Sequence, residues 1–303
     1  MIDIAASHQD RIGCSQIAQA LNLSQWGTAY QLWEQYTGRA ERPNIGHHLR
    51  VALGEPMETV LKPFVEERLG RELRRDRREF LHSDIPLIGH VDYRASALNG
   101  EPRPVVDMKT SLGWGAAGRF GDASMDDVDD DVLLQMEGYL LLTGAQTAYV
   151  AALVPGPELK IYTIQADPDL HEMIVQGVAA FWHCVKTDTP PSLVSLADAS
   201  RRWPNHDPDT VLPAESADRQ RIADLRDLLA TIKEMEKEAD ALKLALMSRL
   251  ENREALVDMQ GKPICTWKTQ NRTVVDNAAL KAAGIYEQYT KTTTNRVFRL
   301  KGE

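Results

Sequence analysis

Residues 85–111 most constrain the fold, because two short β-type runs lie on either side of a strong turn signal. The signal is Asn99-Gly100, a dipeptide typical of two-residue hairpin turns. The first run contains Asp92 and the second contains Asp107. Pairing the runs around the turn places these aspartates roughly opposite each other. The sequence therefore predicts an antiparallel hairpin with two facing carboxylates.

Lys109 lies two positions after Asp107, so both side chains share one face of the predicted strand. One interpretation is an ordinary salt-bridged strand end. The other is a metal site, since facing carboxylates at the ends of apolar strands repel and are costly to desolvate. Mg²⁺ would relieve that repulsion, because it binds one or two carboxylates together with a substrate phosphate. Lys109 could then orient or deprotonate a metal-activated water, or stabilise charge on the phosphate.

Two predicted helices carry further polar candidates. Glu58, a third carboxylate, lies near the start of a helix that the apolar positions indicate as far as residue 69. Gln135 and Tyr139 are four residues apart on a helix predicted over residues 132–143, so they share one face. These side chains are candidates to surround the facing aspartates.

The other elements alternate between helix and strand. Residues 11–37 predict a helix, a turn and a second helix. Trp26 and Trp33 are seven residues apart, a helical spacing that favours packing in the core over stacking on bases. Residues 147–167 predict two strands joined by Pro-Gly-Pro, and residues 168–191 predict an amphipathic helix that two prolines end. This alternation indicates a mixed α/β domain over residues 1–186.

The C-terminal third has a different character. Residues 187–216 are rich in Pro, Asp and Ser, and predict a linker. Residues 217–254 contain no Gly or Pro, and their apolar positions recur every three or four residues, which predicts one long amphipathic helix. Its apolar seam would be a packing surface for its own tail or for another subunit. The tail predicts a small hairpin, a short helix and a final strand, so residues 217–303 form a C-terminal appendage.

Composition excludes several classes of protein. No apolar run approaches the roughly 20 residues that span a bilayer, and the N-terminus lacks a signal pattern, so we expect a cytoplasmic protein. The three cysteines form neither a disulfide framework nor a metal knuckle, and are too few for an iron–sulfur cluster. A net charge of −9 argues against a general nucleic-acid coat protein. Basic residues do cluster over 68–78, where they either contact a DNA backbone or form a solvated, ion-paired face.

The motifs GHVD, VVDMKTS and QMEGY, in this order, resemble the core of the PD-(D/E)xK nucleases. The resemblance is to the form shared by RecB-type nucleases and the YqaJ-like phage exonucleases related to lambda exonuclease. RIGCSQIAQALNLSQWGTAYQLWEQYTG resembles the N-terminal segment of the YqaJ-like proteins, and GEPME resembles their Gly-x-x-x-Glu helix. The similarity covers about residues 11–185. It implies a restriction-endonuclease-like core, with a central mixed sheet flanked by helices, to which the long helix and small hairpin are appended.

The resemblance also implies roles for individual residues. The metal ligands would be Glu58, Asp92 and Asp107, holding one or two Mg²⁺ ions, with Mn²⁺ as a possible substitute. Lys109 would be the catalytic lysine, and Gln135 would lie beside it. This sequence departs from the pattern in two ways: the first Asp follows His-Val rather than Ser-Pro, and the second acid is Asp rather than Glu.

Three more residues are implied as contacts to substrate. Ser15 would contact a 5′-phosphate, and Arg11 would be a second phosphate contact, although it lies closer to Ser15 than in the lambda-type pattern. Tyr139 would lie near the scissile phosphate or contribute to packing of its helix.

As a whole, the resemblance implies a metal-dependent 5′-to-3′ exodeoxyribonuclease that degrades linear double-stranded DNA in phage-type homologous recombination. Its partners would be double-stranded DNA ends, further copies of the chain in a trimeric or tetrameric ring, and a single-strand annealing protein. Two alternatives remain open at this point. One is a non-catalytic scaffold that binds DNA ends, and the other is a structure-specific endonuclease.

Overall fold

The computed structural model describes residues 10–44, 46, 48–98, 100–111 and 119–301. The chain forms two compact units, Met1–Arg202 and Trp203–Glu303. The boundary between these units falls inside the predicted linker. None of the helices within the described ranges is long and apolar enough to cross a membrane.

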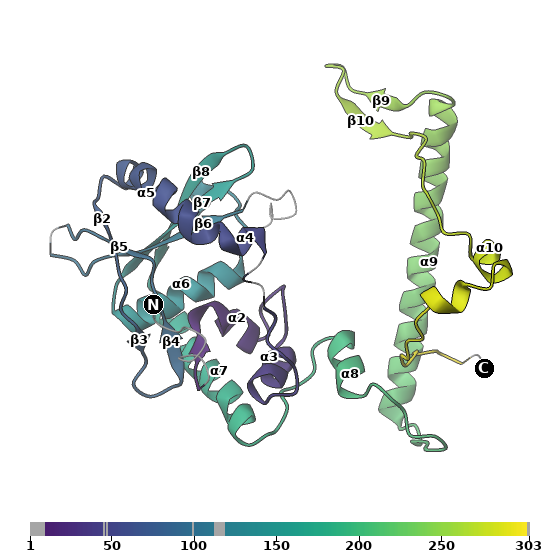
Figure 1. Cartoon of the computed structure of the whole chain (residues 1–303), viewed down its shortest axis with the longest axis horizontal. Helices are drawn as coiled ribbons and strands as arrows, with labels where there is room; N and C mark the ends of the chain where they lie inside the picture. The colour runs from purple at the N-terminus through teal and green to yellow at the C-terminus, as the bar shows by residue number, and fades with distance from the viewer. Residues whose placement is uncertain (1–9, 45, 47, 99, 112–118, 302–303) are drawn as a thin grey trace. The chain divides into compact units, whose positions relative to one another are not determined.

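A five-stranded mixed sheet organises the first unit (Figure 1). Its strand order is β2-β5-β6-β7-β8. β6 and β7 are parallel, whereas the other neighbouring strands are antiparallel. The strands are β2 (Leu73–Arg75), β5 (Tyr93–Ala95), β6 (Val105–Thr110), β7 (Thr147–Val154) and β8 (Glu158–Gln165). The predicted fold class, a central mixed sheet flanked by helices, is confirmed.

The predicted hairpin is the β5–β6 pair. Tyr93 pairs with Val106 and Arg94 pairs with Val105. The same register, continued by one residue, places Asp92 opposite Asp107. Of the predicted turn, Asn99 lies outside the described residues and Gly100 has a φ of 80°. That backbone conformation is one that glycine adopts without steric cost. The antiparallel pairing is therefore confirmed.

The first predicted run of the hairpin is divided between two sheets. Its earlier part is β4 (Leu87–Gly89), which lies in a separate three-stranded sheet between β1 (Ile12–Gly13) and β3 (Phe80–Leu81). β1 is parallel to β4, so the N-terminal segment begins as a strand rather than as the predicted helix. It continues as η1 (Cys14–Gln16), α2 (Ile17–Ala20) and α3 (Ala29–Tyr36). Asp92 thus follows the break between two sheets, where the backbone no longer has a full ladder of partners.

Helices cover both faces of the central sheet. β6 has apolar side chains on both of its faces, and each face must be shielded from water. Val105 belongs to one core, and Val106 belongs to a second core on the opposite face. The first core contains apolar residues of α6 (Asp130–Thr143) and α7 (Pro168–Lys186), together with those of α2 and α3. The second contains Leu61 and Val65 of α5 (Gly54–Leu69), which follows α4 (Leu49–Ala52). Asp107 and Lys109 alternate onto the same face as Val105, toward α6.

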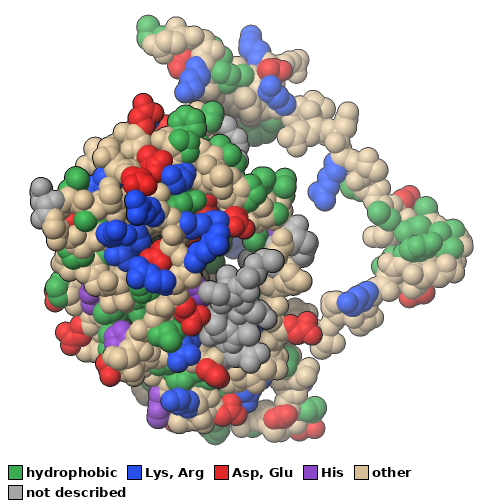
Figure 2. Space-filling model, turned by 60° about the vertical axis from the view of Figure 1, so that its left-hand side comes forward, with side chains coloured by type: hydrophobic (Ala, Val, Ile, Leu, Met, Phe, Trp, Pro, Cys, Tyr) green, Lys and Arg blue, Asp and Glu red, His purple; other side chains and the backbone are tan. Residues whose placement is uncertain are grey.

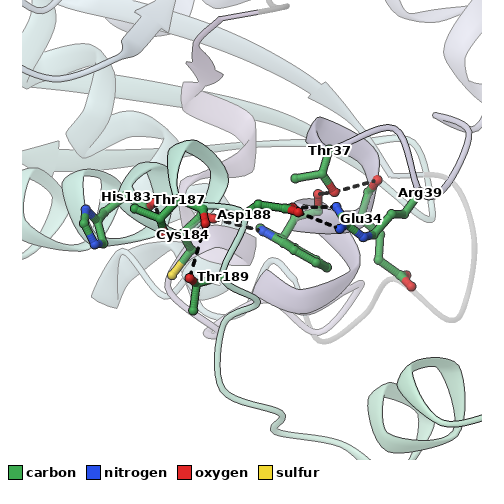
Figure 3. Close-up of polar contacts among 9 residues, drawn as sticks. Glu34, Thr37, Arg39, His183, Cys184, Thr187, Asp188 and Thr189 are labelled. Carbon is green, nitrogen blue, oxygen red and sulfur yellow. Dashed lines mark hydrogen bonds and ion pairs between the residues drawn. The ribbon is translucent and has the colours of Figure 1, made fainter.

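The C-terminal end of α7 is fixed to α3 by polar contacts (Figure 3). The Arg39 guanidinium lies 2.7 and 2.9 Å from the two carboxylate oxygens of Asp188. The Trp33 indole donates a hydrogen bond of 3.1 Å to the carbonyl of Cys184. Trp33 is 3% exposed, as its predicted place in the core requires. These contacts join two helices that are about 150 residues apart in the sequence.

The predicted linker is wrong over its first half. Residues 196–202 form α8 (Leu196–Arg202), which packs on the first unit. Asp198 is fully buried and accepts a hydrogen bond of 2.8 Å from the Thr28 hydroxyl. Arg201 donates a hydrogen bond of 2.7 Å to Glu34. Polar composition indicated a linker, but one buried carboxylate with fixed partners is enough to hold this segment in place.

The second unit contains the predicted long helix and small hairpin. The helix is α9 (Ser216–Leu250), and β9 (Ala255–Val257) pairs antiparallel with β10 (Pro263–Thr266). The tail adds α10 (Asn277–Ala282) and η4 (Tyr286–Tyr289). The predicted final strand is not formed, because residues 296–301 have no strand partner among those the structure describes.

We expect Asp198→Ala to lower the free energy of unfolding of the first unit by about 1–3 kcal/mol, because the partly buried Thr28 hydroxyl would lose its acceptor. Urea unfolding followed by tryptophan fluorescence measures this change. Asp207→Ala, at an exposed position after α8, is the matched control and should leave stability unchanged. Equal effects of the two substitutions would show that α8 is not held by this carboxylate.

Candidate active site

β6 carries the centre of the candidate site, at its third and fifth residues. The Asp107 side chain is 2% exposed and the Lys109 side chain is 25% exposed. Lys109 Nζ lies 2.9 Å from Asp107 Oδ2 and donates a hydrogen bond of 3.0 Å to Gln135 Oε1 on α6. The predicted strand face and the predicted helix face therefore meet at the lysine.

Gln135 is itself held by Tyr139. Its amide Nε2 donates a hydrogen bond of 2.9 Å to the Tyr139 hydroxyl, one turn further along α6. Tyr139 is only 6% exposed, and burial raises the pKa of its hydroxyl well above the ordinary value, with the charges of Asp107 and Asp92 adding to the effect. Its phenol therefore stays protonated and orients Gln135. Of the two predicted roles of Tyr139, the structure shows packing of the helix.

Asp92 experiences the repulsion that the sequence predicted. The Met108 backbone N–H donates a hydrogen bond of 3.4 Å to Asp92 Oδ2. Burial raises the pKa of the Asp92 carboxyl to about 8, the negative charges of Asp107 and Glu58 add to the increase, and Lys109 opposes it. Without a bound cation, the Asp92 carboxyl therefore keeps its proton in most molecules near neutral pH. The facing pair of carboxyls then carries less than two negative charges.

Glu58 is near the aspartates but is paired elsewhere. Arg75 donates a hydrogen bond of 2.8 Å to Glu58 Oε2 and a second bond of 3.0 Å to Glu55. Burial raises the pKa of Glu58, whereas the bond from Arg75 lowers it. Over the described part of the chain, no three His, Cys, Asp or Glu side chains lie close enough together to hold a metal ion. The predicted ligands Glu58, Asp92 and Asp107 are close enough for their charges to affect one another. They do not form a preformed set of three metal ligands.

The chemistry of these side chains nevertheless fits a hard divalent cation. Asp107 Oδ2 is buried, and it has no hydrogen-bond partner with acceptable geometry even though Lys109 Nζ is close. Buried carboxylate oxygens ordinarily have such partners. Asp92 faces it with a raised pKa, and both residues offer the oxygen ligands that Mg²⁺ and Mn²⁺ prefer. Glu58 could complete the set only by leaving Arg75.

A pocket of about 390 Å³ lies next to the lysine. It is lined by Ser15, Gln19, Ser24, Trp26, Arg119, Asp131 and Gln135. Gln135 therefore faces both the Lys109 ammonium and this pocket. The N-terminal segment approaches α6 closely because position 138 is glycine; a Cβ there would lie 2.5 Å from Ile17 Cδ1. This contact places the predicted phosphate residue, Ser15, beside the candidate site.

The pocket also brings Trp26 and Arg119 together, and neither was a candidate site residue from the sequence. Trp26 is 68% exposed, so its predicted packing in the core is wrong. The Arg119 guanidinium lies 5.9 Å from the centre of the Trp26 ring, and its Nε donates a hydrogen bond of 2.6 Å to Asp129. Helical spacing misplaced Trp26 because the helix starts only at Ala29. Arg119 carries no sequence signal, since only the fold brings it to Ser15.

Arg11, the other predicted phosphate contact, lies in a different hollow. That hollow is lined by residues that include Tyr36, His82 and Trp182. The Arg11 carbonyl accepts a hydrogen bond of 2.7 Å from the Tyr36 hydroxyl. The structure therefore does not bring Arg11 together with Ser15.

The basic segment around β2 is largely ion-paired. Figure 2 shows Lys and Arg side chains gathered on one face of the molecule, with acidic side chains among them. Arg71 pairs with Glu101, and Arg78 pairs with Asp76, which belongs to the same segment. The ion-paired face that the sequence offered as one interpretation is therefore present, and contact with DNA there would have to displace these acids.

Known proteins share this sequence pattern. Residues 5–146 match the family model of the YqaJ-like viral recombinase domain. The chain is 24% identical over 301 residues to "Uncharacterized protein YqaJ" of Bacillus subtilis (strain 168), an alignment that covers 96% of this chain and 91% of that protein. The resemblance predicted from the motifs is therefore confirmed.

Solved structures are also similar. An alkaline exonuclease (LHK-Exo) from Laribacter hongkongensis matches with a TM-score of 0.49 and 12% identity, covering 61% of this chain and 92% of that chain. A phage related exonuclease from Haemophilus somnus 129PT matches with a TM-score of 0.46 and 13% identity, covering 59% and 96% of the two chains.

The raised pKa of Asp92 predicts how stability depends on pH. The folded carboxyl, with a pKa of about 8, holds its proton over a range in which the unfolded carboxyl, with a pKa of about 4, has lost it. The free energy of unfolding of the metal-free protein should therefore fall between about pH 4 and pH 8, by on the order of 2 kcal/mol or more. Asp92→Asn should reduce this slope, since the amide does not titrate; the part that remains comes from Glu137, whose pKa burial raises to about 7.

Chemical denaturation at pH 5 and pH 8 in the presence of EDTA measures this slope. Asp84→Asn, at an exposed position, is the matched control and should keep the slope of the parent protein. If Asp92→Asn and the parent had the same slope, the raised pKa of Asp92 would not be the cause of the pH dependence.

Proposed function

We propose that this chain is a metal-dependent deoxyribonuclease that hydrolyses the phosphodiester backbone of linear double-stranded DNA. The observation that carries the proposal is the position of Lys109, between the buried Asp107 and Gln135, at contacts of 2.9 and 3.0 Å. The match of residues 5–146 to a viral recombinase domain supports the same conclusion. Lysine beside facing aspartates is the arrangement in which a metal-activated water can attack a phosphate.

Asp92 and Asp107 would hold the metal, and Glu58 would join them after separating from Arg75. A bound Mg²⁺ or Mn²⁺ would supply Lewis acidity to the phosphate and lower the pKa of a coordinated water. The remaining chemistry belongs to Lys109. Its ammonium can hold the attacking water, or stabilise the charge that develops on the phosphate oxygens.

Gln135 and Tyr139 would act as positioning residues. The Tyr139 hydroxyl fixes the Gln135 amide, and the amide oxygen fixes the lysine. A flexible four-carbon side chain would otherwise sample many rotamers, and holding it in one of them reduces the entropy lost on reaching the transition state. Because Asp107 is buried, bulk water does not compete with a metal ion or with Lys109 for its carboxylate oxygens.

We also infer that the enzyme acts from 5′ ends. The pocket that Gln135 shares with Ser15 is large enough for a terminal phosphate, and the Ser15 hydroxyl can donate to it. Arg119 lines the pocket and could turn its remaining N–H groups to a phosphate while its Nε stays bonded to Asp129, and Trp26 supplies an exposed ring on which a terminal base can stack. This arrangement supports degradation from the 5′ end. The match to a viral recombinase domain supports a role in phage-type recombination, in which an annealing protein would receive the strand that remains.

Two alternative functions are distinguished by one experiment. A non-catalytic scaffold would leave linear duplex DNA intact in the presence of Mg²⁺, and a structure-specific endonuclease would also cut closed circles. A time course on linear duplexes labelled at either end, and on covalently closed circles, separates these outcomes. We expect Mg²⁺-dependent loss of the 5′ label first, with the circles left intact.

Lys109→Ala should lower the rate of DNA cleavage by at least about 1,000-fold, because it removes the ammonium beside Asp107 that would stabilise the reacting phosphate. Metal-dependent binding of duplex DNA, measured by fluorescence anisotropy, should be retained. Lys186→Ala, at the exposed end of α7, is the matched control. Full activity of Lys109→Ala would overturn the proposed function.

Ser15→Ala should narrow the preference for 5′-phosphorylated over 5′-hydroxyl ends by about tenfold, the value of one hydrogen bond to a charged group. Initial rates on the two substrates measure this ratio. Ser83→Ala, far from Ser15 in the sequence and exposed, is the control and should keep the ratio of the parent. If the parent degrades both ends at one rate, the pocket does not sense the phosphate.

A further inference from the structure

The C-terminal tail concentrates positive charge in a chain that is acidic elsewhere. The basic tail, residues 262–301, contains eight Lys or Arg residues and two Asp or Glu residues. In the rest of the sequence, 42 acidic residues outnumber 27 basic ones. Positive charge that is concentrated in one segment of an acidic protein favours a polyanionic partner for that segment.

Acidic side chains of the second unit do not neutralise the basic tail. α9 carries seven basic and seven acidic residues, and it pairs charges within itself, as Lys237 does with Glu234. In the tail, the Asp276 side chain accepts hydrogen bonds from two backbone N–H groups at the start of α10. Among the residues that the structure describes, Lys268 is the one cation of the tail that pairs with a carboxylate, that of Glu254 at 2.9 Å.

The last part of the basic tail carries cations and no acid. Residues 288–301 include four basic residues, and all four are exposed: Lys291, Arg296, Arg299 and Lys301. Four threonines lie among them, whose hydroxyls can donate hydrogen bonds to phosphate oxygens. The arginines around β2 instead pair with acids. Of the two basic segments, residues 288–301 can therefore bind an anion without first displacing a carboxylate.

Exposed aromatic rings alternate with these cations. Tyr289 is 77% exposed and lies two residues before Lys291, and Phe298 is 80% exposed and lies directly before Arg299. Trp267, which a lysine follows, is 47% exposed. Large aromatic rings left in water gain free energy when a partner covers them. Nucleic-acid bases have flat faces that stack on such rings, while neighbouring cations contact the phosphates.

The backbone of the basic tail is anchored along α9, beside which Figure 1 shows the tail returning. The Trp267 N–H donates a hydrogen bond of 2.9 Å to the carbonyl of Glu254, just beyond the end of α9. Arg226 of α9 donates one of 2.8 Å to the carbonyl of Lys301. The helix between Arg226 and Leu250 is roughly 36 Å long. The tail therefore distributes its rings and cations over a length that fits several nucleotides rather than one phosphate.

We propose that the basic tail binds a single strand of DNA, with Tyr289 and Phe298 stacked on bases and the cations beside them on phosphates. A single strand exposes the faces of its bases, whereas a duplex covers them within its own stack. The rings therefore select a single strand, which the cations alone would not do.

This interaction goes beyond the proposed nuclease function, because none of its residues belongs to the site on β6. Only the choice of DNA over RNA rests on that function, since degradation of one strand of a duplex leaves the other as single-stranded DNA. The tail would then retain the strand that remains.

Fluorescence anisotropy of the full-length protein with 5′-hydroxyl oligo(dT) of about 30 nucleotides, in EDTA, tests the stacking. Phe298→Ala and Tyr289→Ala should each raise the dissociation constant by about tenfold, the effect of losing one stacked base, and should leave that of a duplex of equal length nearly unchanged. Val297→Ala alters an exposed apolar residue beside Phe298 and is the matched control. Equal effects of the aromatic and control variants, or no effect of either aromatic variant, would overturn the proposal.

The dependence of binding on salt tests the cations. The double variant Arg299→Gln, Lys301→Gln should lower the slope of the logarithm of affinity against that of salt concentration by about 1.4, because each phosphate contact with a single strand contributes about 0.7. Lys237→Gln, in an ion pair on α9, is the control and should keep the slope of the parent. An unchanged slope in the double variant would exclude these cations from the site.

Oligo(rU) of the same length tests the choice of DNA. We expect it to bind no more tightly than oligo(dT), and tighter binding would overturn that choice. Because EDTA prevents metal-dependent cleavage in these measurements, an inactive enzyme would still show binding by the tail, and a tail that fails to bind would leave the nuclease function standing. Circular dichroism, unchanged in all variants, establishes that α9 remains helical.

Discussion

The rest of the candidate site depends on the repulsion between Asp92 and Asp107 across the β5–β6 hairpin. Two carboxyl groups face each other where β5 begins, and the pKa of Asp92 is raised first by burial and then by the negative charge of Asp107. The protein offsets part of the cost with the Met108 N–H and the Lys109 ammonium. These partners leave Asp107 Oδ2 without a well-aligned hydrogen bond. The site is thus short of positive charge, and under the proposed function a divalent cation would supply the charge that the side chains do not.

Much of this site could be predicted from the sequence because it depends on local rules. A turn signal and a strand period of two are enough to place Asp92 opposite Asp107, and the four-residue spacing on α6 places Gln135 and Tyr139 on one face. What could not be predicted depends on tertiary contacts. The pairing of Glu58 with Arg75 joins a helix to a strand, and neither partner signals the other in the sequence.

The same distinction explains the errors outside the site. Residues 188–202 have the composition of a linker, yet the buried Asp198 holds them to the start of α3 through one hydroxyl. Trp26 has the spacing of a core residue, yet it precedes the helix and lies exposed. Composition and periodicity average over many residues, whereas each of these outcomes is decided by one side chain.

The Glu58–Arg75 pair determines whether the three acids can act together. Forming the full ligand set requires this contact of 2.8 Å to break. The Arg75 side chain is 34% exposed and the Glu58 side chain is 15% exposed, so solvent screens the pair only in part. A cation between Asp92 and Asp107 removes a repulsion that helps to raise the pKa of Asp92 to about 8. Under the proposed function, Glu58 would therefore join the metal ligands only in exchange for its contact with Arg75.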